Sequence, residues 1–206
     1  MLMFEDYATP LASLLGTYPA VVAEVNGRPI TGDALVAEQV QLEFGRRQIE
    51  AFEDMGQVFP AGYLDQERSD IESTDPLESL IDDELKRQAV ERLGLLPSHE
   101  DGASFARTAE EAFLGDIDEV ANPEGVYETL RVLGWPDHDW DTNEMIVETY
   151  RRGMGMTRLR SEYCNARTPQ PVTALLGFHS GGYDCSAFLA QERESADIVY
   201  YVRWVD

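Results

Sequence analysis

An Asn-Gly pair near the start of the chain constrains its fold more than any other short segment. Residues 21–31 read VVAEVNGRPIT, in which apolar residues run up to Asn26-Gly27 and another apolar residue, Ile30, leads into Thr31. Asn-Gly accepts the positive φ angles of a two-residue hairpin turn. A threonine hydroxyl in this position accepts a backbone N–H from the first turn of a helix. The segment therefore predicts a strand, a tight turn, a short strand and a helix cap.

Helical patterns fill most of the chain after this segment. The spacing of apolar residues predicts a helix over 32–55 that ends at Gly56, and the polar stretch 56–74 reads as a loop. Asp75-Pro76 predicts the start of a second helix, which Gly94 ends. Further helices are predicted from Ser98 to Leu114, from Asn122-Pro123 to Gly134, from about Thr142 to Cys164, and over 185–195 behind a capping Asp184.

The two ends of the chain carry the strand patterns. Residues 197–205 are rich in β-branched and aromatic side chains, which is typical of a strand. A two-stranded hairpin is marginal by itself, so we expect this C-terminal strand to pair with the N-terminal hairpin. The sequence therefore predicts a mainly α fold with a small antiparallel sheet that joins the two ends of the chain.

The charge of the chain excludes several classes of partner. Its 206 residues carry 39 acidic and 16 basic side chains, for a formal net charge of −23. Phosphates need a basic surface, so nucleic acids and anionic membranes are not expected partners. The acidity is typical of a solubilising surface, and a basic client or partner is the functional alternative. No apolar run is long enough to cross a membrane, and residues 1–6 lack the pattern of a signal peptide.

The two cysteines, Cys164 and Cys185, flank a segment with little regular pattern. A disulfide between them would close a loop of roughly 20 residues and stabilise the fold by about 3 kcal/mol. Such a bond would indicate an oxidising compartment. The alternative is a pair of separate, reduced and buried thiols. Two cysteines without CxxC spacing are a weak ligand set, so no metal site is predicted.

The sequence contains no motif for catalysis or for a cofactor. The three histidines are His99, His138 and His179, and none lies in a nucleophile or zinc motif. The acidic segment 137–141, DHDWD, is interpreted as a solvated turn between helices rather than as a metal site. The segment 98–101, SHED, is interpreted as a helix N-terminus, where negative side chains meet the positive end of the helix dipole.

Aromatic and methionine side chains are the remaining candidates for a functional surface. Their ordinary role is core packing, but methionine also suits promiscuous binding because it is flexible and polarisable. The sharper interpretation is a groove for extended or unfolded peptide. The candidate peptide-binding residues are Phe105, Phe113, Trp135, Met145, Tyr150 and Met154.

Four segments, in order, resemble a known family. They are residues 22–31 with the helix that follows, residues 80–95 (LIDDELKRQAVERLGL), residues 133–135 (LGW) with an acidic turn and the helix through 150–160, and residues 188–200. Together they resemble the N-terminal chaperone domain of the SurA- and PrsA-like foldases, which are secreted parvulin-type proteins. The resemblance implies a helical, polypeptide-binding domain closed by the hairpin and the C-terminal strand, and an extracytoplasmic location in the periplasm or at the cell surface.

The chain departs from that family in one large respect. In the foldases a parvulin isomerase domain usually lies between the helical core and the C-terminal strand, but here the intervening segment is too short to hold it. The expected layout is an N-terminal arm over 1–19, a SurA-like helical core over 20–165, a loop over 166–183 in place of the isomerase, and a C-terminal helix and strand over 184–206 that complete the core.

Three functions follow from this layout. The first is a chaperone-like protein that binds unfolded or extended polypeptide without enzymatic activity and without a cofactor. The second is a dedicated interaction subunit that holds one fixed protein partner in an extracytoplasmic or membrane-associated assembly. The third, which the missing domain disfavours, is a prolyl isomerase.

Overall fold

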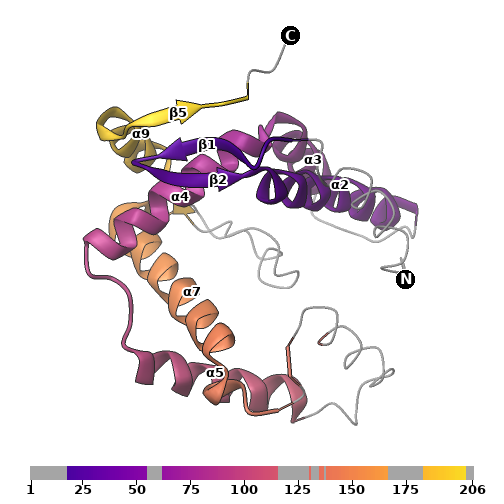
Figure 1. Cartoon of the computed structure of the whole chain (residues 1–206). Coiled ribbons are helices and arrows are strands. Elements are labelled where there is room, and N and C mark those ends of the chain that lie inside the picture. Colours follow the sequence, from indigo (N-terminus) through magenta and orange to yellow (C-terminus); the bar gives the residue numbers. More distant parts are fainter. Residues whose placement is uncertain are drawn as a thin grey trace. The chain divides into compact units, whose positions relative to one another are not determined.

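A computed structural model describes residues 18–54, 62–115, 130, 135–136, 138–166 and 183–202 of the chain (Figure 1). Gly56, most of the predicted helix over 122–134, and most of the predicted arm and of the 166–183 loop lie outside these residues. The described elements are β1 (Val21–Val25), β2 (Arg28–Thr31), α2 (Gly32–Asp54), α3 (Tyr63–Ser73), α4 (Pro76–Arg92), α5 (His99–Leu114), the 3-10 helix η2 (Trp140–Thr142), α7 (Glu144–Tyr163), β3 (Asn165–Ala166), β4 (Tyr183–Asp184), α9 (Ser186–Ser195) and β5 (Ile198–Tyr200).

The prediction of a mainly helical fold with a small antiparallel sheet is confirmed. Asn26 and Gly27 adopt φ angles of 52° and 78°, as a tight hairpin turn requires. The sheet has the order β2-β1-β5, with both neighbours antiparallel to β1 (Figure 1). The C-terminal strand therefore adds to the N-terminal hairpin, although within the described residues it covers 198–200 rather than the predicted 197–205.

The chain forms two compact units. The first combines residues 1–86 with 164–206, and the second is the continuous stretch 87–163. In the first unit, one face of the sheet and residues of α2 and α4 share a hydrophobic core, whose buried members are Val22, Ala23, Val25, Ile30, Leu35, Leu77, Ile81 and Leu85. The second unit has its own core around α5, η2 and α7.

Predicted caps define several helix ends. The Thr31 hydroxyl accepts the N–H of Ala34 at 3.2 Å at the start of α2. The Asp75 carboxylate accepts the N–H of Leu77 at 2.8 Å at the start of α4. Gly94, with φ of 66°, follows the end of α4, where the N–H of the next residue, Leu95, donates to the carbonyl of Val90 at 3.0 Å.

Helix α3 corrects the prediction that 56–74 is a loop. Residues 63–73 are mostly polar, yet they form a helix whose buried residues are Tyr63 and Ile71. Ile71 packs at Gly45 of α2, where an added Cβ would lie 3.0 Å from its Cδ1 atom. Arg68 donates to the Glu53 carboxylate at 2.7 Å. Contacts with α2 therefore stabilise a helix that its own sequence specifies weakly.

A cluster of polar side chains holds the C-terminal segment to α4. Arg193 of α9 contacts Asp82 at 2.6 Å and Glu78 at 2.7 Å. The Tyr200 hydroxyl of β5 donates to the Glu78 carboxylate at 2.9 Å. Burial lowers the pKa of Arg193, but hydrogen bonds and charges from Glu78 and Asp82 outweigh this effect and leave the pKa above its usual value. The guanidinium is therefore a permanent cation between two acidic side chains.

The disulfide between Cys164 and Cys185 is present, as predicted (S–S 2.06 Å). It lies beside the short ladder in which Asn165 pairs with Asp184 and Ala166 pairs with Tyr183. Helix α9 begins at Ser186, so its N-cap residue is Cys185 and not the predicted Asp184. Asp184 still serves the first turn, because its carboxylate accepts the Ser186 N–H at 2.9 Å.

None of the helices in the described ranges combines the length and the apolar character needed to cross a membrane.

Candidate functional site

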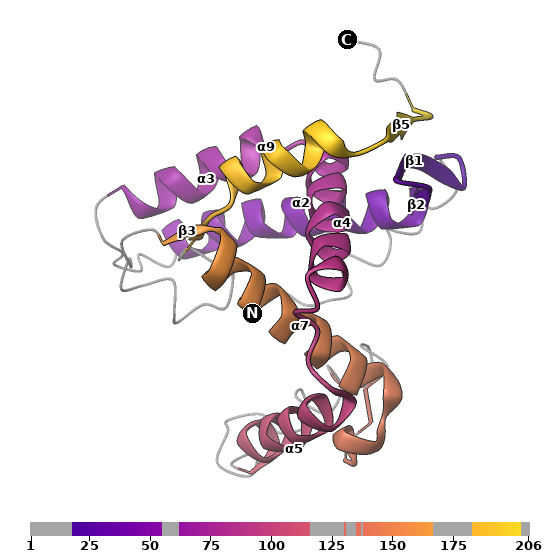
Figure 2. The ribbon, with the colours of Figure 1, turned by 90° about the vertical axis from the view of Figure 1, so that its left-hand side faces the viewer.

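The candidate site lies in the second unit, where α5 packs against α7 (Figure 2). Helix α5 begins as predicted at Ser98, whose hydroxyl accepts the Asp101 N–H at 3.1 Å while the Asp101 carboxylate accepts the Ser98 N–H at 3.2 Å. The Ser98 hydroxyl also donates to the Asp101 carboxylate at 2.8 Å, and this bond first, followed by that from the Ser98 N–H, lowers the pKa of Asp101. At the start of α7 the Asn143 side chain accepts the N–H of Ile146 at 3.2 Å. Both helices therefore have fixed first turns.

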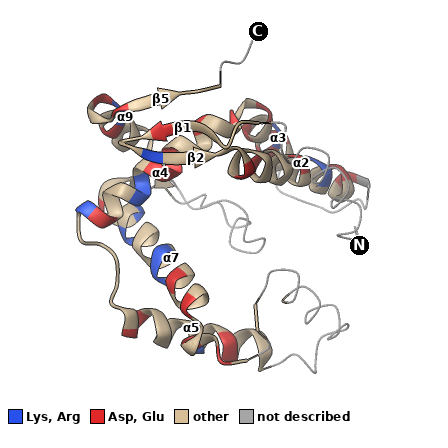
Figure 3. Ribbon diagram, in the orientation of Figure 1, with Lys and Arg blue, Asp and Glu red and all other residues tan. Residues whose placement is uncertain are grey.

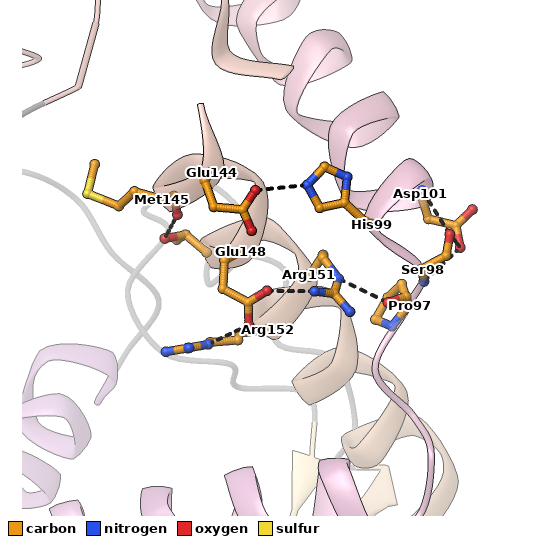
Figure 4. A network of polar contacts seen from close by, with 10 residues as sticks. Pro97, Ser98, His99, Asp101, Glu144, Met145, Glu148, Arg151 and Arg152 are labelled. Atoms are coloured by element: carbon orange, nitrogen blue, oxygen red, sulfur yellow. Dashed lines mark hydrogen bonds and ion pairs between the residues drawn. The ribbon is translucent and has the colours of Figure 1, made fainter. Parts of the chain in front are cut away.

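Polar contacts near these first turns hold the two helices together (Figure 4). Arg151 of α7 donates to the carbonyl of Pro97 at 3.1 Å and to Glu148 at 2.7 Å. His99 of α5 contacts Glu144 of α7 at 3.0 Å. At Gly102 the helices are so close that an added Cβ would lie 2.3 Å from Cγ of Arg151. This network positions the two walls of the site.

Side chains of α5 also hold the η2 turn. The Glu110 carboxylate accepts the backbone N–H groups of Asp139 at 3.2 Å and of Trp140 at 2.8 Å. Arg107 forms an ion pair with Asp141 at 2.6 Å. Asp139 adopts a positive φ of 63°, which the two bonds to Glu110 support. The turn is therefore fixed against α5, with Trp140 directed inward.

Five aromatic rings form a continuous series in this unit. Ring centroids are 5.3 Å apart for Phe105 and Tyr150, 6.1 Å for Tyr150 and Trp135, 5.0 Å for Trp135 and Trp140, and 5.8 Å for Trp140 and Phe113. Tilted and edge-on arrangements at such spacings are favourable for aromatic pairs. The Trp140 indole N–H donates to the carbonyl of Pro136 at 2.8 Å, which fixes the Trp140 ring.

A hollow of about 480 Å³ lies among these rings. Its volume is within the range of pockets that hold small ligands, about 300–1,000 Å³. Burial raises the pKa of the Tyr150 phenol, so this group is a neutral hydroxyl at physiological pH. The lining is almost wholly apolar and consists of Ala109, Ala112, Phe113, Leu130, Trp135, Trp140 and Tyr150.

The structure brings together three of the six predicted binding residues. Phe113, Trp135 and Tyr150 line the hollow. Phe105 contacts Tyr150 but is not part of the lining, and Met145 is 50% exposed in the first turn of α7. Met154 is half-buried one turn beyond Tyr150 on α7 and is also outside the lining.

Trp140 lines the hollow but is not among the six predicted binding residues. It lies in the acidic segment interpreted as a solvated turn, but it is only 2% exposed. That interpretation is wrong for this residue, because Glu110 and Arg107 hold its turn against α5. The two small lining residues Ala109 and Ala112 recur at helical spacing with Phe113, a signal that marks one face of α5.

Charged side chains of both signs surround the site. Helix α7 begins with an acidic residue in its first turn and carries arginines further along, up to Arg160 in its last turn, whereas the first turn of α5 is acidic (Figure 3). His99 and His138 lie beside Glu144 and Glu110, and His179 is outside the described residues. Among the residues that the structure describes, no three potential ligands gather as a metal site would require. The lining of the hollow offers mainly apolar contact.

Comparisons with known proteins identified no relative. No family model matches the chain, and no match emerged among curated proteins or among solved structures.

Proposed function

We propose that the protein binds unfolded or extended polypeptide by taking apolar side chains into the aromatic hollow, and that it acts by binding and not by catalysis. The observation that carries this proposal is the apolar lining formed by Phe113, Trp135, Trp140 and Tyr150, with Phe113 half-exposed at 50%. The half-exposed ring offers a first contact for an apolar side chain. The resemblance to foldase chaperone domains supports the same function.

The lining favours binding of many different apolar side chains over selective binding of one ligand. Selective pockets use a few placed polar groups to orient a ligand. Within the described lining, the Trp140 N–H is already bonded to Pro136, so the polar side-chain groups at the hollow are few: the Trp135 indole N–H and the Tyr150 hydroxyl. Burying one large apolar side chain contributes about 1.5–3 kcal/mol. One such contact alone gives weak binding, so a client must be held at several places.

The test is suppression of aggregation when a client protein is diluted from denaturant, followed by light scattering. We expect the wild-type chain to lower scattering and Phe113→Ser to do so far less. Met145→Ser is the matched control, because Met145 is equally exposed at 50% but lies outside the lining. Equal suppression by both variants would exclude the hollow as the site. Failure of the wild-type chain to suppress aggregation would overturn the proposed function.

A fixed protein partner is the second candidate function. The exposed rings of Phe105 and Phe113 on α5 favour it, since aromatic residues are enriched at interfaces. A stoichiometric partner in a native pull-down, without general chaperone action, would support this function. The disulfide supports an oxidising, extracytoplasmic setting for either function.

A further inference from the structure

The outer edge of β5 offers a second place for polypeptide, in the first unit. Within the described sheet, β2 and β5 are the two edge strands. An edge strand presents backbone N–H and C=O groups that have no partner in the sheet, and an extended peptide can pair with them. Whether an edge accepts such a strand depends on which backbone groups point outward and on the side chains beside them.

The hydrogen bonds between β1 and β5 show which groups point outward. Asn26 donates to the carbonyl of Asp197 at 2.7 Å, and Tyr201 donates to the carbonyl of Val22 at 2.9 Å. Antiparallel pairing alternates between bonded and non-bonded pairs. Residues 197, 199 and 201 therefore face β1, whereas the backbone groups of Ile198 and Tyr200 point away from it. The outer edge offers two N–H donors and two C=O acceptors.

The opposite edge of the sheet is blocked. In the β1–β2 ladder, Pro29 stands opposite Glu24, between the pairs that Arg28 and Ile30 make with β1. After a two-residue turn the closing pair is hydrogen-bonded, so the backbone nitrogen at Pro29 points outward. Proline has no N–H, and proline at an edge is a common protection against strand addition. Residues 197–202 of the β5 edge contain neither proline nor lysine.

The side chains beside β5 favour a basic ligand. Val199 and Tyr201 are exposed at 38% and 53% and provide apolar contact. Desolvation and then the carboxylates of Glu24 and Asp197 raise the pKa of the Tyr201 phenol, which places both acids near this ring. The whole chain carries a net charge of −23. A second copy would bring the same negative charge to the edge, whereas a basic polypeptide would be attracted.

We propose that an extended polypeptide rich in basic and apolar residues adds as a strand to the outer edge of β5, through the backbone of Ile198 and Tyr200. This inference rests on the proposed function for the class of ligand, but it uses a different unit from the aromatic hollow. Main-chain pairing supplies affinity for many sequences, and the acidic surroundings select among them.

Two substitutions at one position test the backbone contact. Tyr200→Ala and Tyr200→Pro both remove the phenol side chain, and neither removes a hydrogen bond of the ladder to β1. Proline, unlike alanine, also lacks the backbone N–H that points outward. The probe is a short fluorescent peptide that alternates valine and lysine, followed by anisotropy. We expect Tyr200→Pro to weaken binding about tenfold relative to Tyr200→Ala. Equal binding by the two variants would overturn the proposal, provided that both show the same unfolding transition.

The charge preference has its own test at an exposed position. Val199→Lys should weaken binding of the valine–lysine peptide and Val199→Glu should strengthen it, whereas a valine–glutamate peptide should bind neither protein well. If the glutamate peptide binds wild type as tightly as the lysine peptide does, the ligand class is wrong. If Tyr200→Pro instead converts a dimer to a monomer in sedimentation without peptide, the edge is an interface between copies and the proposal fails.

The proposals for the aromatic hollow and for the β5 edge can be tested independently of each other. Phe113→Ser should leave binding of the valine–lysine peptide unchanged, because Phe113 lies in the second unit. Loss of client protection in Phe113→Ser with intact peptide pairing would support both proposals. Intact client protection in Phe113→Ser together with a clear difference between the two Tyr200 variants would overturn the hollow alone.

Discussion

Asn26 and Asp197 exchange two hydrogen bonds that join the hairpin turn to the segment before the last strand. The Asn26 N–H donates to the carbonyl of Asp197 at 2.7 Å, and the Asp197 N–H donates to the Asn26 side-chain oxygen at 2.8 Å. The residue that shapes the turn therefore also receives the C-terminal segment. Glycine can adopt the positive φ of Asn26, but it cannot provide the side-chain oxygen that accepts the Asp197 N–H.

Substitution at Asn26 separates these roles. Asn26→Gly keeps the turn but removes the acceptor for Asp197, so we expect the free energy of unfolding to fall by about 0.5–1.5 kcal/mol. Hydrogen exchange at the Asp197 amide should accelerate. Asn26→Asp keeps an acceptor oxygen and serves as the control. The same exchange rate in wild type and Asn26→Gly would contradict the assigned bond.

Removal of the disulfide should destabilise the first unit. The bond joins residues separated by 21 positions, and loops of this size contribute about 3 kcal/mol through the unfolded chain. We expect the Cys164→Ser, Cys185→Ser double variant to unfold at lower urea than the oxidised wild type. Reductant should shift wild type to the midpoint of the variant and leave the variant unaffected. Coincident curves before reduction would exclude a stabilising role for the bond.

Two glycines of α7 should respond in opposite directions to alanine. An added Cβ at Gly155 would lie 2.7 Å from Cγ1 of Val90, so Gly155→Ala should cost about 1–3 kcal/mol through overpacking. At Gly153 nothing lies within 4 Å of such a Cβ. Gly153→Ala should therefore stabilise the helix by about 0.5–1 kcal/mol. Thermal unfolding measures both, and a shift of the same sign would contradict this packing.

Stability at high pH should depend on Tyr200. Burial first, and then the hydrogen bond to Glu78, raise the pKa of this phenol above the usual value for tyrosine, about 10. A raised pKa means that the folded state holds the proton more tightly, so this contribution is complete below pH 10 and is lost as the pH rises through the folded-state pKa. Urea unfolding should show a difference between wild type and Tyr200→Phe that shrinks above pH 10. Other tyrosines are common to both proteins and cancel in this comparison.

The sequence predicted turns and helix ends correctly where a few adjacent residues determine them. The Asn-Gly turn, the Thr31 cap and the Asp75 and Ser98 helix starts each need only neighbouring atoms, so they can be read without the rest of the fold. Helix α3 needs α2: its buried residues Tyr63 and Ile71 are eight positions apart, which leaves no apolar stripe to read.

The candidate site was predictable to the extent that its residues are large and lie on patterned helices. Phe113 and Tyr150 are such residues. Trp140 is not, because its burial depends on Glu110, which is 30 positions away and accepts the Trp140 N–H. Long-range polar contacts of this kind carry no periodic signal, so an acidic segment around a tryptophan reads as exposed until its partners are placed.

The first unit is built from two segments that lie on either side of the second unit in the sequence. The order of synthesis therefore exposes it to misassembly. Its central strand β1 is made long before its partner strand β5, because the whole of the second unit lies between them in the sequence. The second unit, residues 87–163, is complete well before that. Until residue 200 emerges, β1 is an open edge at the moment of greatest exposure to other nascent chains. The synthesis of β5 is therefore the step that closes this edge of β1 and lowers the risk of misassembly.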